Sequence, residues 1–240
     1  MIAQAVLAQG GGFVRDRGGS SSCVADNGFC PQWIWDNLDR YTNPLLEHIY
    51  LVLVSVGIGF VIAFGLGLLA HRKRWLIGPL AGVTGALYTI PSIAMFFLLQ
   101  PLLGRGNAPA IVALAIYTQI IIFRNVVNGL AGVPAEMVDA AAGMGMTPMQ
   151  RLFRVEVPLA LPEILAGLRI ACATTVGLAA YAALAGAGGL GQQLIVSSLI
   201  VFKSNVVVAG GLVTLLAAAL DLIVLAIQRA LTPWRRAVAA

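Results

Sequence analysis

The chain has 240 residues, of which 59% are hydrophobic and only 10% are charged. A soluble domain carries about 25% charged residues, so this composition excludes an ordinary water-soluble protein and indicates a chain surrounded by lipid. The net charge of +5 would suit a nucleic-acid partner, but the fifteen basic residues fall in small groups between apolar runs. They form no basic face. We therefore predict an all-α membrane protein that binds no nucleic acid.

The first 44 residues differ from the rest, because Gly, Ser, Asp and Asn are frequent there and apolar runs are short. We interpret residues 1–44 as a polar tail outside the membrane. In an oxidising compartment a disulfide between Cys23 and Cys30 is favoured, and two free thiols are the alternative. Cys172 lies in an apolar run and is expected to be a small buried side chain.

Five later segments are apolar enough to cross a bilayer, since a membrane helix needs about 20 predominantly apolar residues. They lie at residues 49–70, 76–104, 108–127, 163–184 and 205–228. Pro91 is expected to break or kink the second span, because proline removes a backbone hydrogen bond. The predicted transmembrane domain covers residues 45–235 and leaves a short tail at 236–240.

Lysine and arginine gather in the loops on one side of these spans. This side holds Arg72, Lys73, Arg74, Arg151, Arg154, Arg169, Arg229, Arg235 and Arg236. The opposite loops hold Arg105 and Lys203, and the tail adds Arg15, Arg17 and Arg40. Because basic residues are enriched in cytoplasmic loops, we predict an N-terminus outside and a C-terminus in the cytoplasm.

The long cytoplasmic loop, residues 129–162, is predicted to begin with a short helix. Pro134 suits its first turn, and the alanines at 140–142 are strong helix formers. Gly143 and Gly145 are expected to end it.

A second short helix is expected to begin at Thr147. Thr147 would cap it, Pro148 fits its first position, and Gln150 would complete a capping box. Pro158 and Pro162 are expected to end the segment before the fourth span. We expect four side chains of this loop to be exposed, either as a docking surface or lying on the membrane: Met144, Met146, Met149 and Leu152.

The same loop resembles the EAA motif of ABC importer permeases, which reads E-A-A, three residues, G, nine residues, I-x-L-P. Here Asp139-Ala140-Ala141 is followed at that spacing by Gly145 and by Val155-Glu156-Val157-Pro158. Asp139 stands where the family has Glu. The resemblance implies a coupling helix at residues 139–150 that sits in a cleft of a separate ATPase. The contact residues it implies are Asp139, Ala140, Ala141, Gly143, Gly145, Met146, Thr147, Pro148 and Gln150.

Other stretches are similar to the osmoprotectant permeases, the glycine betaine, carnitine and choline group. These stretches are Tyr88-Thr89-Ile90-Pro91-Ser92-Ile93-Ala94, residues 143–148, residues 186–191 and Leu231-Thr232-Pro233. The resemblance implies a five-span, type I ABC importer permease in a bacterial or archaeal cell membrane. It also implies an ATPase dimer that binds ATP and Mg, a second permease (identical or paralogous) and an extracytoplasmic solute-binding protein. An importer for an amino acid or another small solute is the alternative.

A translocation path is predicted beside the proline of the second span, where freed backbone groups would line a cavity. The residues expected to border it are Tyr88, Thr89, Pro91, Ser92, Met95 and Asp221. Asp221 is an acid at membrane depth, which is costly unless it is paired or wet. It is either a cavity acid that favours a cationic solute or half of a pair with Arg124 or Arg169, and we favour the pair.

Four other functions fit the sequence poorly. Gly186-x-Gly188-x-x-Gly191 formally matches a dinucleotide fingerprint, but it follows a membrane span rather than a strand, so a tight external turn is expected. The chain has no Walker A sequence, so ATP hydrolysis is expected in a partner and no cofactor in this chain. His48 and His71 lie at opposite ends of the first span, so we predict no catalytic residues and no metal site. The EAA-like loop argues against an ATP-independent channel.

Overall fold

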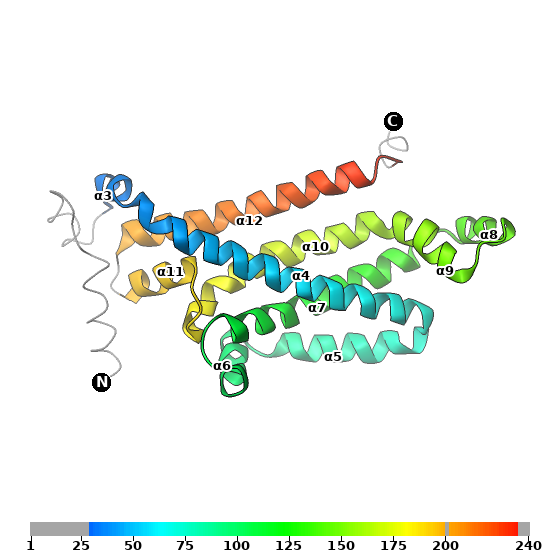
Figure 1. The fold of residues 1–240 in the computed structure, drawn as a ribbon, viewed down its shortest axis with the longest axis horizontal. Helices are drawn as coiled ribbons and strands as arrows, with labels where there is room; N and C mark the ends of the chain where they lie inside the picture. Colours follow the sequence, from blue (N-terminus) through cyan, green and yellow to red (C-terminus); the bar gives the residue numbers. More distant parts are fainter. Residues whose placement is uncertain (1–28, 200–201, 235–240) are drawn as a thin grey trace.

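The computed structural model describes residues 29–199 and 202–234, which form helices joined by turns (Figure 1). The helices long and apolar enough to cross a membrane are Leu38–Arg72, Asn107–Ala131, Pro148–Ala185 and Lys203–Leu231. A fifth crossing is available if the bent pair Arg74–Thr89 and Ser92–Leu103 counts as one span. The predicted all-α class and the upper count of five spans are therefore confirmed.

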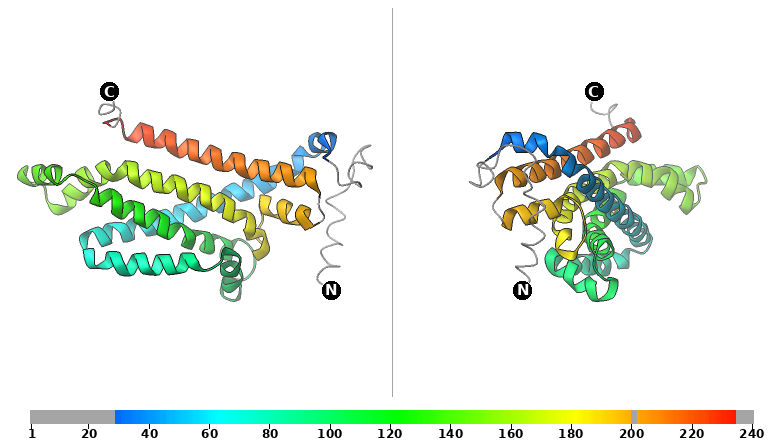
Figure 2. Two further views of the ribbon diagram at one scale, coloured as in Figure 1. Left: turned by 180° about the vertical axis from the view of Figure 1, so that it is seen from behind. Right: turned by 60° about the vertical axis from the view of Figure 1, so that its left-hand side comes forward.

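The long helices run side by side along the long axis of the molecule (Figures 1 and 2). They are α4 (Thr42–Arg72), α5 (Ile77–Thr89), α7 (Asn107–Ala131), α10 (Val157–Ala179) and α12 (Lys203–Leu231). Two short helices project at one end, α8 (Ala135–Gly143) and α9 (Pro148–Arg151). Three others gather toward the opposite end, α3 (Pro31–Asp36), α6 (Ser92–Leu103) and α11 (Leu190–Leu199). One end of the bundle thus carries the predicted coupling loop.

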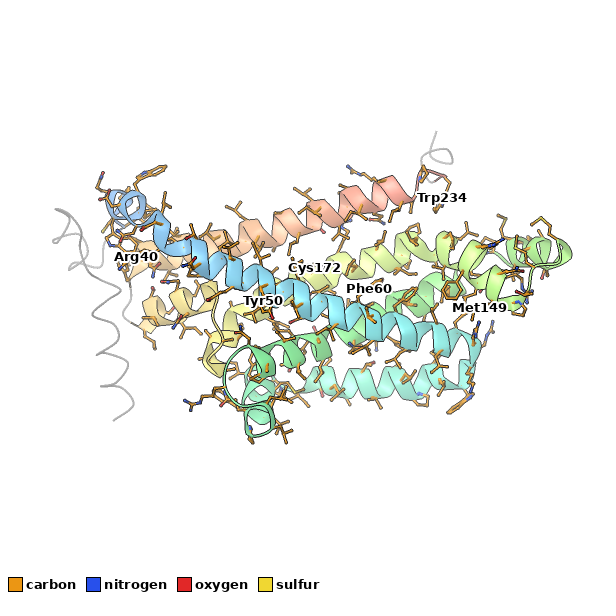
Figure 3. All side chains as sticks on the ribbon, viewed as in Figure 1. Arg40, Tyr50, Phe60, Met149, Cys172 and Trp234 are labelled. Atoms are coloured by element: carbon orange, nitrogen blue, oxygen red, sulfur yellow. The ribbon has the colours of Figure 1, made fainter. Side chains whose placement is uncertain are left out.

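Helix α7 is the centre of the bundle, since α4, α5, α6 and α10 all pack against it. One apolar cluster, near the α11 end, includes Leu51, Phe96, Leu114 and Cys172. Cys172 is buried, as predicted, and lies within the bundle in Figure 3. A second cluster, near the α8 end, includes Ala70, Phe123, Val126, Leu130 and Leu152.

Glycine allows α4 to approach α7 closely, as small residues do at helix contacts in membranes. A Cβ atom added at Gly59 would overlap the side chain of Thr118, and one added at Gly67 would overlap that of Val126. A Cβ atom at Gly57 or Gly65, on another face of α4, would meet nothing within 4 Å. The spacing of α4 and α7 therefore depends on two specific glycines.

Several predicted boundaries differ from those observed. Helix α4 begins at Thr42, seven residues before the predicted span, and the loop helix α11 was not predicted. The prediction that Pro158 and Pro162 end the loop was wrong. Helix α9 instead continues through a π turn (Leu152–Glu156) into α10. Pro158 lies directly after the π turn, within the first residues of α10. The fourth span thus begins well before residue 163.

We expect Gly59→Ala and Gly67→Ala to destabilise the permease by about 1–3 kcal/mol each, because the added methyl group overfills a closed contact. Gly57→Ala and Gly65→Ala are the matched controls and should be neutral or slightly stabilising, since alanine favours a helix. The measurement is the thermal unfolding midpoint of the purified, detergent-solubilised protein. Equal midpoints for all four variants would contradict the packing described for α4 and α7.

Candidate functional site

The predicted coupling segment, residues 139–150, forms a rigid elbow at the projecting end of the bundle. Helix α8 ends at Gly143, and Gly145 adopts a left-handed conformation with φ of +80°. The predicted capping box at Thr147 is present. The Thr147 N–H donates to Gln150 Oε1 at 2.8 Å, and the Gln150 N–H donates to Thr147 Oγ1 at 3.4 Å. The elbow is therefore fixed by its own backbone and caps.

Most side chains of this segment are exposed, as a docking surface requires. Met144 is 71% exposed and Met149 is 50% exposed, and Met149 is seen at this end in Figure 3. Asp139, Pro148 and Gln150 are also exposed, whereas Ala141 is buried and Met146 is half-buried. Leu152 was predicted to be exposed, and this was wrong. It is buried in the apolar cluster of α4 and α7, because the continuous helix turns it inward.

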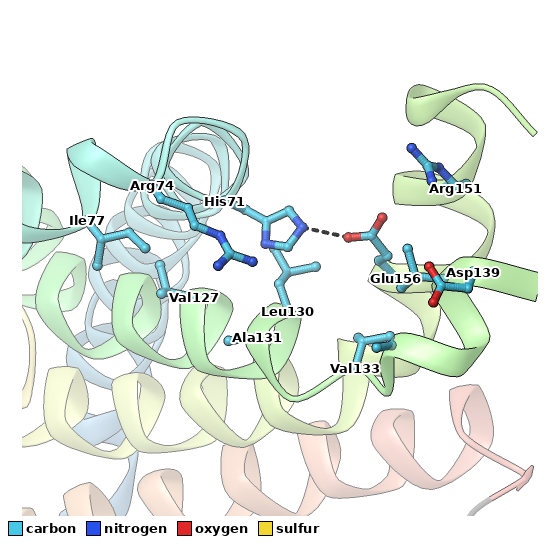
Figure 4. Close-up of a pocket in the computed structure, with 12 residues that line it drawn as sticks. His71, Arg74, Ile77, Val127, Leu130, Ala131, Val133, Asp139, Arg151 and Glu156 are labelled. Carbon is cyan, nitrogen blue, oxygen red and sulfur yellow. Dashed lines mark hydrogen bonds and ion pairs between the residues drawn. The ribbon is translucent and has the colours of Figure 1, made fainter. Parts of the chain in front are cut away.

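A cavity of about 620 Å³ lies at the base of the elbow (Figure 4). Its charged lining residues are His71, Arg74, Asp139, Arg151 and Glu156. His71 Nε2 lies 2.6 Å from Glu156 Oε2, and this pair joins the end of α4 to the π turn. One residue along, Arg72 Nη2 donates to Met149 Sδ at 2.7 Å. Sequence reasoning missed these contacts, because the partners are 85 and 77 residues apart.

The second predicted span is broken as expected. Helix α5 ends at Thr89, Ile90 and Pro91 are extended, and α6 leaves at 97°. The break frees the Ile90 carbonyl, which accepts a hydrogen bond from the hydroxyl of Tyr117 on α7. The ring of Tyr117 also meets the edge of Tyr88, with centroids 5.7 Å apart. Tyr117 thus stabilises the break that Pro91 creates.

The path residues predicted around this break are not all on one surface. Tyr88, Thr89 and Pro91 are exposed, and Ser92 is half-buried. Met95 turns inward and is buried in the apolar cluster with Phe96 and Tyr117. Met95 is therefore buried, and it does not share a surface with Tyr88, Thr89, Pro91 and Ser92.

Asp221 is paired, which is the alternative that the sequence favoured. Arg169 Nε donates to Asp221 Oδ1 at 2.7 Å, and Arg169 Nη2 donates to Asp221 Oδ2 at 2.8 Å. This bidentate pair joins α10 to α12, and Arg169 rather than Arg124 is the partner. Both side chains are about one-third exposed in the chain. Lipid does not stabilise an exposed pair of this kind, so this face requires water or protein beside it.

The glycine-rich stretch forms a tight turn at the end of the bundle opposite α8. Gly186 and Gly189 have φ values of +81° and +95°, which suit glycine. The Gly189 N–H donates to Glu47 at 2.9 Å, and a Cβ atom at Gly188 would overlap the Glu47 carboxylate. The turn follows a helix and holds a side chain of α4, so it has no resemblance to a nucleotide site.

Two further predictions concern a disulfide and a metal site. Cys30 is buried, but Cys23 lies outside the described residues, so the disulfide stays a prediction. Within residues 29–199 and 202–234, no three His, Cys, Asp or Glu side chains come close enough to hold a metal ion.

Known proteins resemble the chain over most of its length. Residues 55–237 match the family described as binding-protein-dependent transport system inner membrane component. The osmoprotectant import permease protein OsmW of Salmonella typhimurium is 38% identical, over 84% of this chain and 96% of its own length. The choline transport system permease protein OpuBB of Bacillus subtilis is 36% identical, over 84% of this chain and 93% of its own length.

Solved structures agree with this assignment. The inward-facing MetNI methionine ABC transporter matches with a TM-score of 0.68 and 28% identity, over 82% of this chain and 99% of that chain. An amino acid ABC transporter matches with a TM-score of 0.66 at 16% identity, which shows the fold alone. The family works with a substrate-binding protein and an ATPase, and ATP hydrolysis belongs to the ATPase. The chain therefore belongs to the binding-protein-dependent inner membrane components and is a transmembrane permease subunit of an ABC importer, not an enzyme.

Proposed function

We propose that this permease imports a quaternary-ammonium osmoprotectant, such as glycine betaine, choline or carnitine. The observation that carries the proposal is the similarity to OsmW and OpuBB over more than four-fifths of the chain. The similarity to the MetNI structure favours an amino acid as the second candidate, at lower identity.

We infer that the end carrying α8 and α9 faces the cytoplasm. Basic residues gather there, at Arg72, Lys73, Arg74 and Arg151, and positive charge favours the cytoplasmic side. Helix α12 ends on the same side, so the C-terminus would be cytoplasmic and residues 1–44 would lie outside. Residues 45–235 would form the transmembrane domain, with residues 236–240 as a cytoplasmic tail.

The complete importer would contain two permeases, identical or paralogous, with two ATPases and an extracytoplasmic solute-binding protein. The ATPases would bind ATP and Mg, and this chain would hold no cofactor. Their closure would push on residues 139–150, where Asp139, Ala140, Gly143, Gly145, Thr147, Pro148 and Gln150 are exposed. Ala141 and Met146 would support this surface from inside. The push would tilt the spans and open the path alternately outward and inward.

The path would run beside the break between α5 and α6, where Tyr88, Thr89, Pro91 and Ser92 reach the surface of the chain. Asp221 would act on the path through its pair with Arg169 rather than as a free carboxylate. Selection of the solute would rest mainly on the separate binding protein, because no dense aromatic cluster lines this stretch.

Uptake by the assembled importer should be fastest for a labelled quaternary ammonium compound. Glycine betaine, choline, carnitine and methionine should be compared in proteoliposomes that hold both permeases and the ATPases, with the binding protein outside. Transport of methionine alone would contradict the osmoprotectant assignment and leave the importer assignment intact.

Gly145→Val should impair coupling, because a β-branched residue is strained by about 1–2 kcal/mol or more at φ of +80°. Gly145→Asn should retain most of the activity, since asparagine tolerates this conformation. Gly143→Ala is the comparison for an added side chain on the same surface without backbone strain, because Gly143 is helical and has nothing within 4 Å of its Cβ position. The measurements are co-purification of the ATPase and solute uptake, and equal loss in Val and Asn variants would show that the backbone conformation is unimportant.

Pro91→Ala should reduce uptake more than assembly, because alanine restores an N–H and allows α5 and α6 to straighten. Pro101→Ala is the control, since Pro101 lies inside α6 and away from the 97° break. Uptake and the yield of assembled complex would be measured for both variants. Unchanged uptake in Pro91→Ala would argue against a path at the break.

A further inference from the structure

The last turn of α4 contacts the π turn through His71 and Glu156 (Figure 4), and it contacts the coupling segment through Arg72 and Met149. His71 Nε2 lies 2.6 Å from Glu156 Oε2, and Arg72 Nη2 lies 2.7 Å from Met149 Sδ. The first contact joins a membrane helix to the π turn, and the second joins the same helix to the segment proposed to meet the ATPase. Neither acceptor is one of the positions that the EAA pattern specifies, since Glu156 occupies the variable place in Val155-Glu156-Val157-Pro158.

The contacts lie on one face of the helical segment that follows the elbow. Met149, Leu152 and Glu156 are three and four residues apart, which places them on the same side of a helix. Leu152, between the two polar contacts, is buried in the same apolar cluster as Ala70. Two polar contacts, one on each side of Leu152, therefore join this face of the segment to the end of α4.

The backbone provides a second connection from the same segment. Helix α9 continues through the π turn Leu152–Glu156 into α10 without interruption. Single π turns inside helices are rare, and those that occur are often found at functional sites. A displacement of α9 would therefore pass to α10 through the backbone, and to α4 through the side chains of Met149 and Glu156.

The pair of His71 and Glu156 is suited to transmit such a displacement. The two side chains are 24% and 12% exposed, so water screens their interaction less than that of a surface pair. The other charged groups that face the cavity are Arg74, Asp139 and Arg151, from the turn after α4, from α8 and from α9. None of these three stands between His71 and Glu156, which are in direct contact.

We propose that His71 and Glu156 are positioning residues that transmit movement of the coupling segment to α4, so that α4 and α10 move together when the ATPases close. This inference rests on the proposed function of the chain as a coupled importer subunit. It names the side chains through which the ATP cycle would move α4, which the EAA resemblance does not include.

The test is the amount of solute imported per ATP hydrolysed by the complete importer in proteoliposomes. His71→Ala and Glu156→Ala should each lower this ratio roughly three- to tenfold, as mutations along a coupling network do. Lys73→Ala, an exposed residue in the same turn, is the matched control and should leave the ratio unchanged. The double variant should be no worse than either single variant, because both remove one interaction.

A second readout follows the end of α4 itself. Trp75, in the turn after α4, is 72% exposed, and a fluorine label on its indole would report its surroundings by ¹⁹F NMR, assigned with Trp75→Phe. ATP should shift this signal in the wild-type complex, and the shift should be largely lost in His71→Ala. His71→Phe and Glu156→Met provide the same comparison if the alanine variants fail to assemble, since both changes roughly conserve side-chain size and remove the hydrogen bond.

The outcomes separate the inference from the proposed function. A wild-type complex that does not couple ATP hydrolysis to uptake would contradict the proposed function. A wild-type complex that couples normally, with unchanged ratios in the His71 and Glu156 variants or no ATP-dependent shift at Trp75, would overturn this inference alone. A lowered ratio with non-additivity, together with loss of the Trp75 shift, would support it.

Discussion

The structure depends on one constraint, which is that lipid offers no hydrogen-bond partner to the backbone. Helices satisfy this constraint by themselves, so each departure from a helix needs a partner from elsewhere in the protein. The Ile90 carbonyl, freed at the break before Pro91, is satisfied by the Tyr117 hydroxyl. This break in the helix therefore lies where a side chain of a neighbouring helix supplies the missing hydrogen bond.

Close helix packing is therefore needed to hold the break before Pro91 in place. The Tyr117 hydroxyl reaches Ile90 only if α7 holds its place against α4 and α5, and Gly59 and Gly67 set the approach of α4 to α7. Between lipid-exposed helices no hydrophobic force brings the backbones together, so small residues and polar contacts carry the association. The pair of Arg169 and Asp221 serves α10 and α12 in the same way.

Sequence reasoning succeeded where the information is local. Apolar runs located the long helices, Pro91 located the break, and Thr147 with Gln150 located the cap, because each signal lies within a few residues. It failed where tertiary contact decides. Leu152 was expected outside and is buried, and Pro158 and Pro162 were expected to end a helix that continues through a π turn. The partners of His71 and Glu47 are more than 80 residues away, and no local pattern indicates them.

The fold connects the two regions proposed to be functional through α7 and its neighbours. The elbow of α8 and α9 extends from the C-terminal end of α7, and the break between α5 and α6 is held by Tyr117 near the middle of that helix. Helix α7 is the most enclosed element, whereas α12 buries only a small share of its surface within the chain. A push at the elbow therefore meets a packed centre, which transmits displacement because closely packed interiors compress little.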